Sequence, residues 1–425
     1  MAKREIQMTL QDAIRMMGTA STISSESDGA LVRSVDNAQA AELSAHPKLP
    51  YKPVITAALG VHGDFEMRPI AAMLEIARGT VLNEDPDIAA FARRWSILRY
   101  LGIFARDAGT GKLHLDGAAL RYVGGNQRRV LSEELGIGFG IIAGKRWCRK
   151  RMPTIGSITA IDVDKALKRG KVPNLRPEGN RQPDYLLSYS DSRNPGVKIY
   201  DLLETKGTGS RAYAKKQLGR AVTQLAGLTL NHQEMTGIAV TTVSDERGIH
   251  VMAVDPEEPP VAWRPTNAAL VSSRAAKGPF PPDDFKVDLP REEFLAAATN
   301  VGFAGLAEFS GQRGVATRWF PDIDSERKDK VDARVPRETA AGSFVGTEYV
   351  LMIPGASDRL RVFQGVDKDV AEGLRALDVT AVLESQQAFA RSHAGYSDIS
   401  SESIGDTAAA SAFTSDGSML EISIA

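Results

Sequence analysis

Residues 181–207 read RQPDYLLSYSDSRNPGVKIYDLLETKG and place acidic residues at matching points of a predicted β-hairpin. Asp184 opens one apolar run, and Glu204 with Lys206 closes the next. The Ser, Asp, Asn, Pro and Gly residues between the runs are typical of a turn. Side chains at i and i+2 of a strand point to the same face. Glu204 and Lys206 are therefore expected to project together, with Asp184 beside them from the paired strand.

Two carboxylates and an ammonium group at one sheet edge suit a hard divalent cation and an activated water, as in metal-dependent phosphodiester cleavage. The alternative is an ordinary surface ion pair between Glu204 and Lys206. Two other acid-x-lysine triplets end at Lys286 and Lys328. Proline-rich loop chemistry surrounds the first and a solvated charge run the second, so only Glu204 ends a strand-like run.

Further elements are predicted in a definite order around this hairpin. They are a helix over Asn126–Trp147, the two hairpin strands, a helix over Arg211–Leu230, and strands over Thr236–Val243 and Ile249–Val254. In this order and in its motif residues, the chain resembles the PD-(D/E)XK nuclease superfamily over residues 125–255. The resemblance implies an α/β fold of the restriction-endonuclease-like kind, with a mixed central sheet flanked by helices.

The resemblance also implies a function. Asp184, Glu204 and Lys206 would be catalytic, with Asp184 and Glu204 ligating Mg²⁺ or Mn²⁺ and Lys206 orienting or helping to deprotonate the attacking water. The substrate would be nucleic acid, with DNA favoured over RNA, and the setting restriction or antiviral defence against phage. The alternative is a non-catalytic nucleic-acid-binding or protein-interaction module that retains the nuclease-like fold.

Members of this superfamily often add another acid from the first helix of the core. The helix over Asn126–Trp147 offers Glu133 and Glu134, and we expect Glu134 to join the metal site. The alternative is an exposed carboxylate in the first turns, stabilised there by the helix dipole. The positions of Glu133 and Glu134 in the predicted helix do not decide which of them faces the metal site.

Two groups of basic residues are candidates for contact with phosphates. Lys145 and Arg146 begin a basic run through Arg151, in which Trp147 offers a ring for base stacking. The second group lies on the helix after the E-x-K strand and comprises Lys215, Lys216 and Arg220. The alternative for the first group is a cationic helix C-terminus that interacts with its own carbonyls.

Composition is compatible with a folded protein but does not single out a nuclease. The 425 residues are 43% hydrophobic and 25% charged, and the formal net charge of −1 gives no global basic field. Cys148 is the single cysteine, which excludes an internal disulfide and a cysteine-rich zinc site and points to a reducing compartment. Without a signal-peptide core or a run of transmembrane length, we expect a cytoplasmic protein with no membrane association.

The chain divides by pattern into three predicted parts. These are a mainly helical region over 1–120 with a winged-helix-like helix and hairpin near 88–115, a nuclease-like core over 121–260, and an α+β domain over 261–425 with a polar, flexible tail from Ser397. The flanking parts are expected to select the substrate, to bind a partner protein or to form a homo-oligomer.

Overall fold

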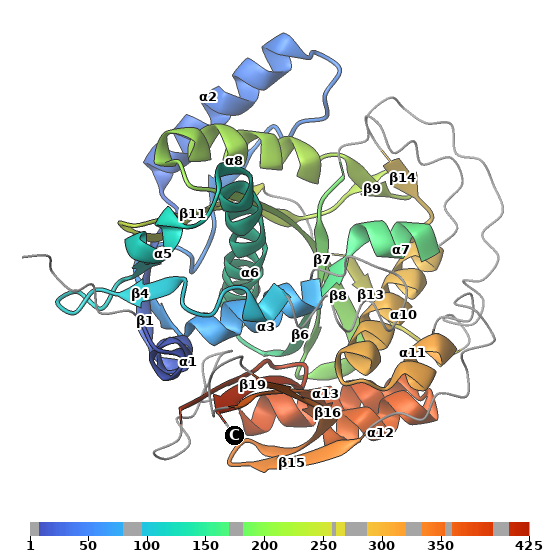
Figure 1. Ribbon diagram of the computed structural model, residues 1–425. Helices are drawn as coiled ribbons and strands as arrows, with labels where there is room; N and C mark the ends of the chain where they lie inside the picture. The colour runs from blue at the N-terminus through green and yellow to red at the C-terminus, as the bar shows by residue number, and fades with distance from the viewer. Residues whose placement is uncertain are drawn as a thin grey trace, which may run out of the picture.

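The computed structural model describes residues 8–79, 96–169, 182–256, 261–267, 287–319, 334–352, 359–393 and 408–424. It is a mixed α/β structure, with a curled central sheet and helices on both of its faces (Figure 1). The strand order of this sheet is β3-β1-β12-β11-β8-β7-β6, with β2 added to β12 and β13 to β8. Among the described helices, none is long and apolar enough to cross a membrane.

The predicted order of core elements is confirmed, but the helix predicted to reach Leu230 ends at Leu225, because residues 228–230 form a short strand. The core comprises α6 (Gly125–Arg151), β6 (Ile155–Asp162), α7 (Val163–Arg169), β7 (Tyr185–Asp191), β8 (Asn194–Thr208), α8 (Arg211–Leu225), β9 (Leu228–Leu230), β10 (Gln233–Glu234), β11 (Gly237–Asp245), β12 (Gly248–Pro256) and β13 (Val261–Trp263). β7 and β8 form the expected hairpin, closed by a turn in which Asp191 Oδ1 accepts a hydrogen bond from the Arg193 backbone nitrogen. β11 then pairs in parallel with β8 and antiparallel with β12.

Alternation along β8 divides the apolar interior between two helices. Leu203 faces the core formed with Leu135 of α6, whereas Leu202 faces the core formed with Leu218 of α8. Each face of the sheet is therefore covered by one long helix, α6 on one face and α8 on the other. Glu204 and Lys206 have the parity of Leu202 and belong to the α8 side.

Glycines allow α6 to lie unusually close to β8. A Cβ atom on Gly136 would lie 2.6 Å from the backbone of Gly207, and one on Gly140 would lie 2.6 Å from the Thr205 side chain. Contacts this short leave no room for a side chain, so the α6 backbone rests directly on the strand that carries the E-x-K residues. The order of these contacts also shows that α6 runs antiparallel to β8.

The N-terminal part adds strands to the central sheet. It comprises α1 (Leu10–Gly18), β1 (Ser21–Glu26), α2 (Gly29–Ala45), β2 (Ile55–Ala57), β3 (Phe65–Met67), α3 (Pro69–Gly79), β4 (Phe104–Arg106), β5 (Leu113–Leu115) and α5 (Gly117–Arg121). β1 pairs in parallel with β12 and antiparallel with β3. The predicted hairpin is confirmed as β4–β5. Most of the helix predicted over Ile88–Leu101 lies outside the described residues.

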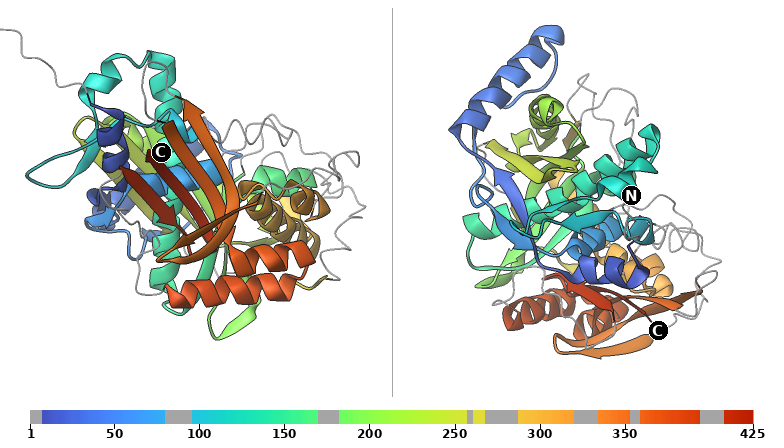
Figure 2. Two further views of the ribbon diagram at one scale, coloured as in Figure 1. Left: turned by 60° about the horizontal axis from the view of Figure 1, so that its bottom comes forward. Right: turned by 60° about the vertical axis from the view of Figure 1, so that its left-hand side comes forward.

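The C-terminal part forms a second sheet with helices (Figure 2). It comprises β14 (Val287–Leu289), α10 (Arg291–Phe309), α11 (Arg313–Trp319), β15 (Val335–Thr339), β16 (Gly342–Met352), β17 (Arg359–Asp367), α12 (Lys368–Ala376), α13 (Val379–Ser392), β18 (Ala409–Phe413) and β19 (Ser418–Ile424). The order of this sheet is β15-β16-β17-β19-β18, and β14 pairs instead with β9.

The prediction of a polar, flexible tail is wrong for residues 408–424. They form the buried strands β18 and β19, which belong to the C-terminal sheet. The turn between them carries Asp416, which is fully buried, pairs with the guanidinium of Arg78 and accepts a hydrogen bond from Thr159 Oγ1 at 3.1 Å. This turn thus docks a buried charge onto α3 and β6.

Candidate functional site

Asp184 and Glu204 lie opposite each other on neighbouring strands. Tyr185 pairs with Leu203, which places Asp184 immediately before β7 and level with Glu204 on β8. Glu204 Oε2 accepts a hydrogen bond from the Asp184 backbone nitrogen at 2.9 Å. Asp184 Oδ2 in turn accepts hydrogen bonds from the Thr205 backbone nitrogen at 3.1 Å and from Thr205 Oγ1 at 3.0 Å. Each carboxylate is thus held by the strand that carries the other.

Lys206 completes the group that the E-x-K spacing predicts. Its ammonium pairs with Glu204 Oε1, and its side chain is 26% exposed while that of Glu204 is fully buried. Lys206 therefore connects the buried carboxylate to the surface at the C-terminal end of β8. The structure brings Asp184, Glu204 and Lys206 together as the alternation of strand side chains predicts.

The electrostatics of this group follow from burial and mutual repulsion. Burial raises the pKa of Glu204 well above its ordinary value, and the nearby Asp184 carboxylate raises it further. Burial alone would lower the pKa of Lys206, but the charges of Glu204 and Asp184 outweigh it, so the pKa of Lys206 is raised. Lys206 is consequently an ammonium ion at neutral pH, and its charge offsets part of the cost of ionising the buried Glu204 carboxyl.

The two glutamates of α6 have different environments. Glu134 is 9% exposed and lies between the Tyr100 hydroxyl and the Arg99 guanidinium, which both contact it. Glu133 is exposed, 3.7 Å from Arg129 Nε, and its charge contributes to the raised pKa of Lys206. The preference for Glu134 is therefore corrected, because Arg99 and Tyr100 engage Glu134. Of the two glutamates, only the charge of Glu133 contributes at Lys206, where it raises the pKa by less than Glu204 and Asp184 do.

The two candidate phosphate-binding residues at the end of α6, Lys145 and Arg146, both contact partners inside the protein. Lys145 is 2% exposed, and its ammonium lies 2.5 Å from Glu75 Oε1. Arg146 stacks over the Phe65 ring at 4.3 Å. Trp147 is fully buried and donates a hydrogen bond from Nε1 to Asp255 Oδ2 at 2.8 Å. The interpretation of Lys145, Arg146 and Trp147 as nucleic-acid contacts is wrong in this respect, because α6 is packed on several sides and these residues have partners inside the protein.

The second basic group lies at the surface in part. Lys215 and Lys216 are exposed on the first turns of α8. Arg220 is half-buried, with Nε 3.3 Å from Glu42 Oε2 and Nη1 donating to the Tyr213 hydroxyl at 2.9 Å. Lys215 and Lys216 are thus available to a ligand, whereas Arg220 binds α2.

Two carboxylates near Asp184 were not part of the sequence prediction. Asp162 ends β6, and Asp164 follows two residues later in α7. Burial raises the pKa of Asp162, and the charges of Asp164 and Asp184 add to this effect. In the sequence, the signal for this pair is an acidic residue at the end of the strand that precedes the hairpin. In the structure, Asp162 pairs with Tyr185 of β7 and so lies next to Asp184.

The donor set fits a hard cation only in part. Within the described ranges, no group of three or more His, Cys, Asp or Glu side chains is arranged to hold a metal ion. Mg²⁺ is often bound by one or two carboxylates and keeps several waters. The reciprocal pair of Asp184 and Glu204 supplies two carboxylates, and a cation would relieve the cost of ionising buried Glu204. Asp184 and Glu204 are thus the two residues that would hold a magnesium ion, with water completing its coordination.

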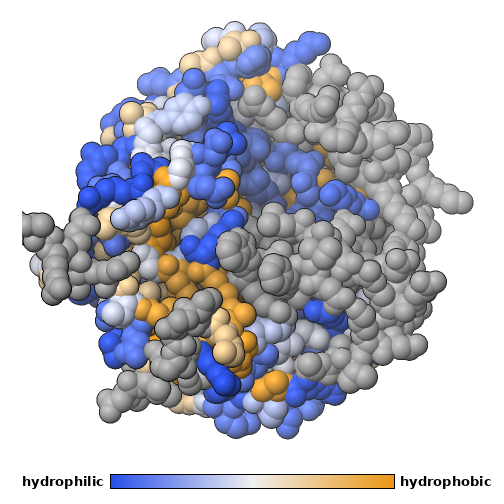
Figure 3. All heavy atoms as spheres, viewed as in Figure 1, coloured by the Kyte–Doolittle hydropathy of each residue, from blue (hydrophilic) through white to orange (hydrophobic). Residues whose placement is uncertain are grey.

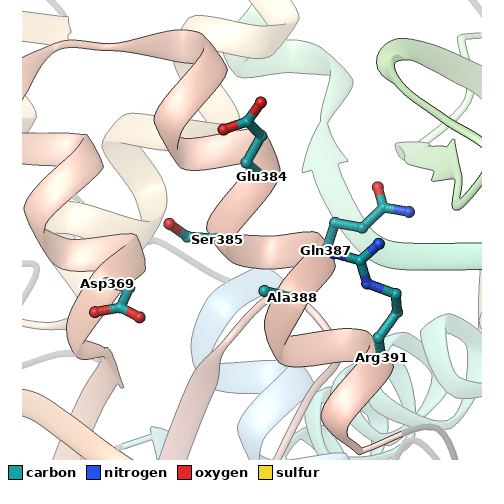
Figure 4. Close-up of a pocket in the computed structure, with 6 residues that line it drawn as sticks. All are labelled: Asp369, Glu384, Ser385, Gln387, Ala388 and Arg391. Carbon is teal, nitrogen blue, oxygen red and sulfur yellow. The ribbon is translucent and has the colours of Figure 1, made fainter.

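A pocket of about 420 Å³ lies elsewhere, on α12 and α13 (Figure 4). Its lining residues are Asp369, Glu384, Ser385, Gln387, Ala388 and Arg391. The sequence-predicted site residues do not line it, so this pocket is separate from the Asp184 site.

Comparisons of the chain with protein-family models, with curated proteins and with solved structures give no match. The functional assignment consequently depends on the geometry of the site and on the motif residues themselves.

Proposed function

We propose that this chain is a Mg²⁺- or Mn²⁺-dependent nuclease with a restriction-endonuclease-like core. The observation that carries the proposal is the reciprocal bonding of Asp184 and Glu204 across β7 and β8, with Lys206 on Glu204. The order of elements from α6 to β12, and the position of the E-x-K residues at the end of β8, support it further.

The bound cation would polarise the scissile phosphate and lower the pKa of the attacking water. Asp184 and Glu204 would hold it, and Thr205 fixes the orientation of the Asp184 carboxylate through two hydrogen bonds. Because the pKa of Lys206 is raised, its ammonium is suited to donating a hydrogen bond that orients the water or stabilises charge on the phosphate, rather than to removing a proton.

The substrate is proposed to be DNA, and the biological setting restriction or defence against phage. Both follow from the superfamily resemblance. The site is consistent with them through Lys215 and Lys216, which are exposed on α8, the helix that starts directly after the E-x-K strand.

Cleavage of DNA in Mg²⁺ or Mn²⁺, measured with and without excess chelator, tests the proposal. Wild-type protein should cleave only with the cation, and Glu204→Gln should be inactive while retaining its fold. Undiminished cleavage in chelator would exclude this mechanism. Binding without cleavage under every cation condition would favour the alternative, a non-catalytic nucleic-acid-binding module.

A further inference from the structure

The two long helices that cover the sheet both begin at the end of β8 that carries Lys206. α8 starts at Arg211, three residues after β8 ends. α6 runs antiparallel to β8, with Gly144 near Leu203 and Gly136 near Gly207. The first turns of α6, from Gly125, therefore extend past the end of β8 on the opposite face of the sheet (Figure 1).

Cationic side chains gather on this end of the molecule. Neither α6 nor α8 has a side-chain cap or an acidic residue in its first turn. Lys215 and Lys216 are exposed, and neither has an ion pair within 4.0 Å among the described residues, although the charge of Lys215 acts on the Asp28 carboxylate. Arg211 Nε lies 3.6 Å from Asp245 Oδ2, and Arg129 Nε lies 3.7 Å from Glu133 Oε1, which are weak surface contacts. Figure 3 shows mainly hydrophilic residues over α8 and the start of α6, with hydrophobic residues below them.

Two tyrosines project from the same end. Tyr122, which follows α5 and precedes α6, is 89% exposed, and Tyr213 in the first turn of α8 is 40% exposed. Lys216 Nζ lies 5.9 Å from the centre of the Tyr213 ring. Exposed aromatic rings next to cations are the combination that binds unpaired bases by stacking while the cations bind phosphates.

The loop that carries Tyr122 is held in place by Arg128. Arg128 donates hydrogen bonds to the carbonyl oxygens of Leu120 at 2.7 Å and of Val123 at 2.9 Å, on either side of the tyrosine. The exposed ring is therefore presented by a fixed backbone rather than by a loose loop, which lowers the entropic cost of binding.

The elements that carry these residues are joined. Gly117 of α5 lies close enough to Glu246 that a Cβ atom would be 3.0 Å from its carboxylate. Asp245, the neighbouring residue, pairs with Arg211 of α8. α5, the β11–β12 turn and the start of α8 thus form one continuous edge.

We propose that this edge binds single-stranded nucleic acid. The strand would run from the start of α8 to the start of α6, past Lys206, with phosphates on the cations and bases on the tyrosines. The binding rim is defined by Tyr122, Arg129, Arg211, Tyr213, Lys215 and Lys216. A role of this rim in catalysis rests on the proposed nuclease function. The nuclease substrate would then be a single strand or the unpaired part of a duplex.

Fluorescence anisotropy in excess chelator measures binding by the rim separately from cleavage. The probes are a labelled single-stranded DNA oligonucleotide, an RNA oligonucleotide of the same sequence, and the DNA duplex. We expect both single strands to bind more tightly than the duplex, and their ratio to assign DNA or RNA. Tyr122→Ala should weaken single-strand binding by at least about 5-fold and leave duplex binding unchanged. The double variant Lys215→Ala/Lys216→Ala should weaken all probes and make the salt dependence shallower by about one counterion per lost contact.

Matched controls come from exposed residues elsewhere. Tyr51→Ala removes a tyrosine that is 52% exposed, and Lys368→Ala removes an exposed lysine of α12. Both should bind like the wild type. Wild-type affinity of Tyr122→Ala, tighter binding of the duplex, or equal competition by polyglutamate would overturn the proposal. Single-strand binding in chelator without cleavage in Mg²⁺ would support the binding rim and refute the nuclease function. Cleavage at the wild-type rate by the rim variants would refute the binding rim and support the nuclease function.

Discussion

The Asp184 carboxylate accepts two hydrogen bonds from Thr205, one from the backbone nitrogen at 3.1 Å and one from the hydroxyl at 3.0 Å. Thr205 lies between Glu204 and Lys206, so the middle residue of the E-x-K triplet orients the acid of the neighbouring strand. Its methyl group fills the space above Gly140 of α6. The residue that the motif leaves unspecified therefore has two defined contacts in this protein.

Thr205→Val tests that orientation while keeping the methyl contact with Gly140. Loss of the hydroxyl should raise the Mg²⁺ concentration for half-maximal cleavage by ~10-fold, because groups that orient ligands typically contribute this much to metal affinity. Titration of the cleavage rate with Mg²⁺ measures it. Thr242→Val, at a buried threonine of β11 whose hydroxyl has no hydrogen-bond partner within the described residues, is the control and should leave the titration unchanged.

Lys206→Ala separates chemistry from binding. It removes the ammonium but leaves both carboxylates, so the single-turnover rate at saturating DNA and Mg²⁺ should fall by ~10²–10³, the loss typical of a donor that stabilises developing charge, while DNA affinity changes little. The double variant of Lys215 and Lys216 should show the converse, with weaker affinity and a nearly normal rate at saturating DNA. A wild-type cleavage rate for Lys206→Ala would mean that its pair with Glu204 is only structural.

Glu133 and Glu134 should respond differently to the same conservative change. Glu133→Gln removes a charge that acts on Lys206 and should lower the metal-dependent rate by ~10-fold. Glu134→Gln leaves the Arg99 guanidinium without its carboxylate, so it should lower the melting temperature without changing the Mg²⁺ dependence. Thermal melting and Mg²⁺ titration of both variants check this, and the assignment is reversed if Glu134→Gln alone alters the titration.

The sequence predicted the hairpin and its three site residues because both depend on local rules. Alternation along β8 and the turn residues at 190–196 are enough to bring Asp184, Glu204 and Lys206 to one place. The roles of Lys145 and Trp147 depend instead on distant partners. Glu75 lies 70 residues before Lys145, and Asp255 lies 108 residues after Trp147, so a charged run on a helix looks solvated until its tertiary contacts are known.

The prediction of a flexible tail is wrong over residues 408–424 for a similar reason. Its small and polar residues, Ala, Ser, Thr and Gly, resemble those of disordered segments. In the structure, residues 408–422 of this tail are buried around Asp416, which is paired with Arg78, 338 residues earlier. The amino-acid composition of the segment gives no information on that ion pair, which forms only when the chain folds and brings the two residues together.

Asp201 gives a pH dependence of stability that can be measured without any substrate. It is fully buried on β8 and accepts hydrogen bonds from the Tyr189 hydroxyl at 2.6 Å and from Arg151 Nη1 at 2.9 Å. Burial raises the pKa of Asp201 from 3.8 to about 6, although Arg151 and Tyr189 oppose the shift. The folded state therefore binds the proton more tightly than the unfolded state does.

A folded-state pKa above the unfolded one contributes stability that is present below pH 3.8 and is lost as the pH rises to about 6. The wild type should thus lose on the order of 3 kcal/mol of unfolding free energy across this window relative to Asp201→Asn, which does not titrate. Urea unfolding of both proteins at several pH values measures the difference. Asp36→Asn, at an exposed carboxylate of α2, corrects for the loss of one negative charge. A wild-type protein that instead gains stability over Asp201→Asn as the pH rises would show that the ion pair with Arg151 outweighs the cost of burying the carboxylate.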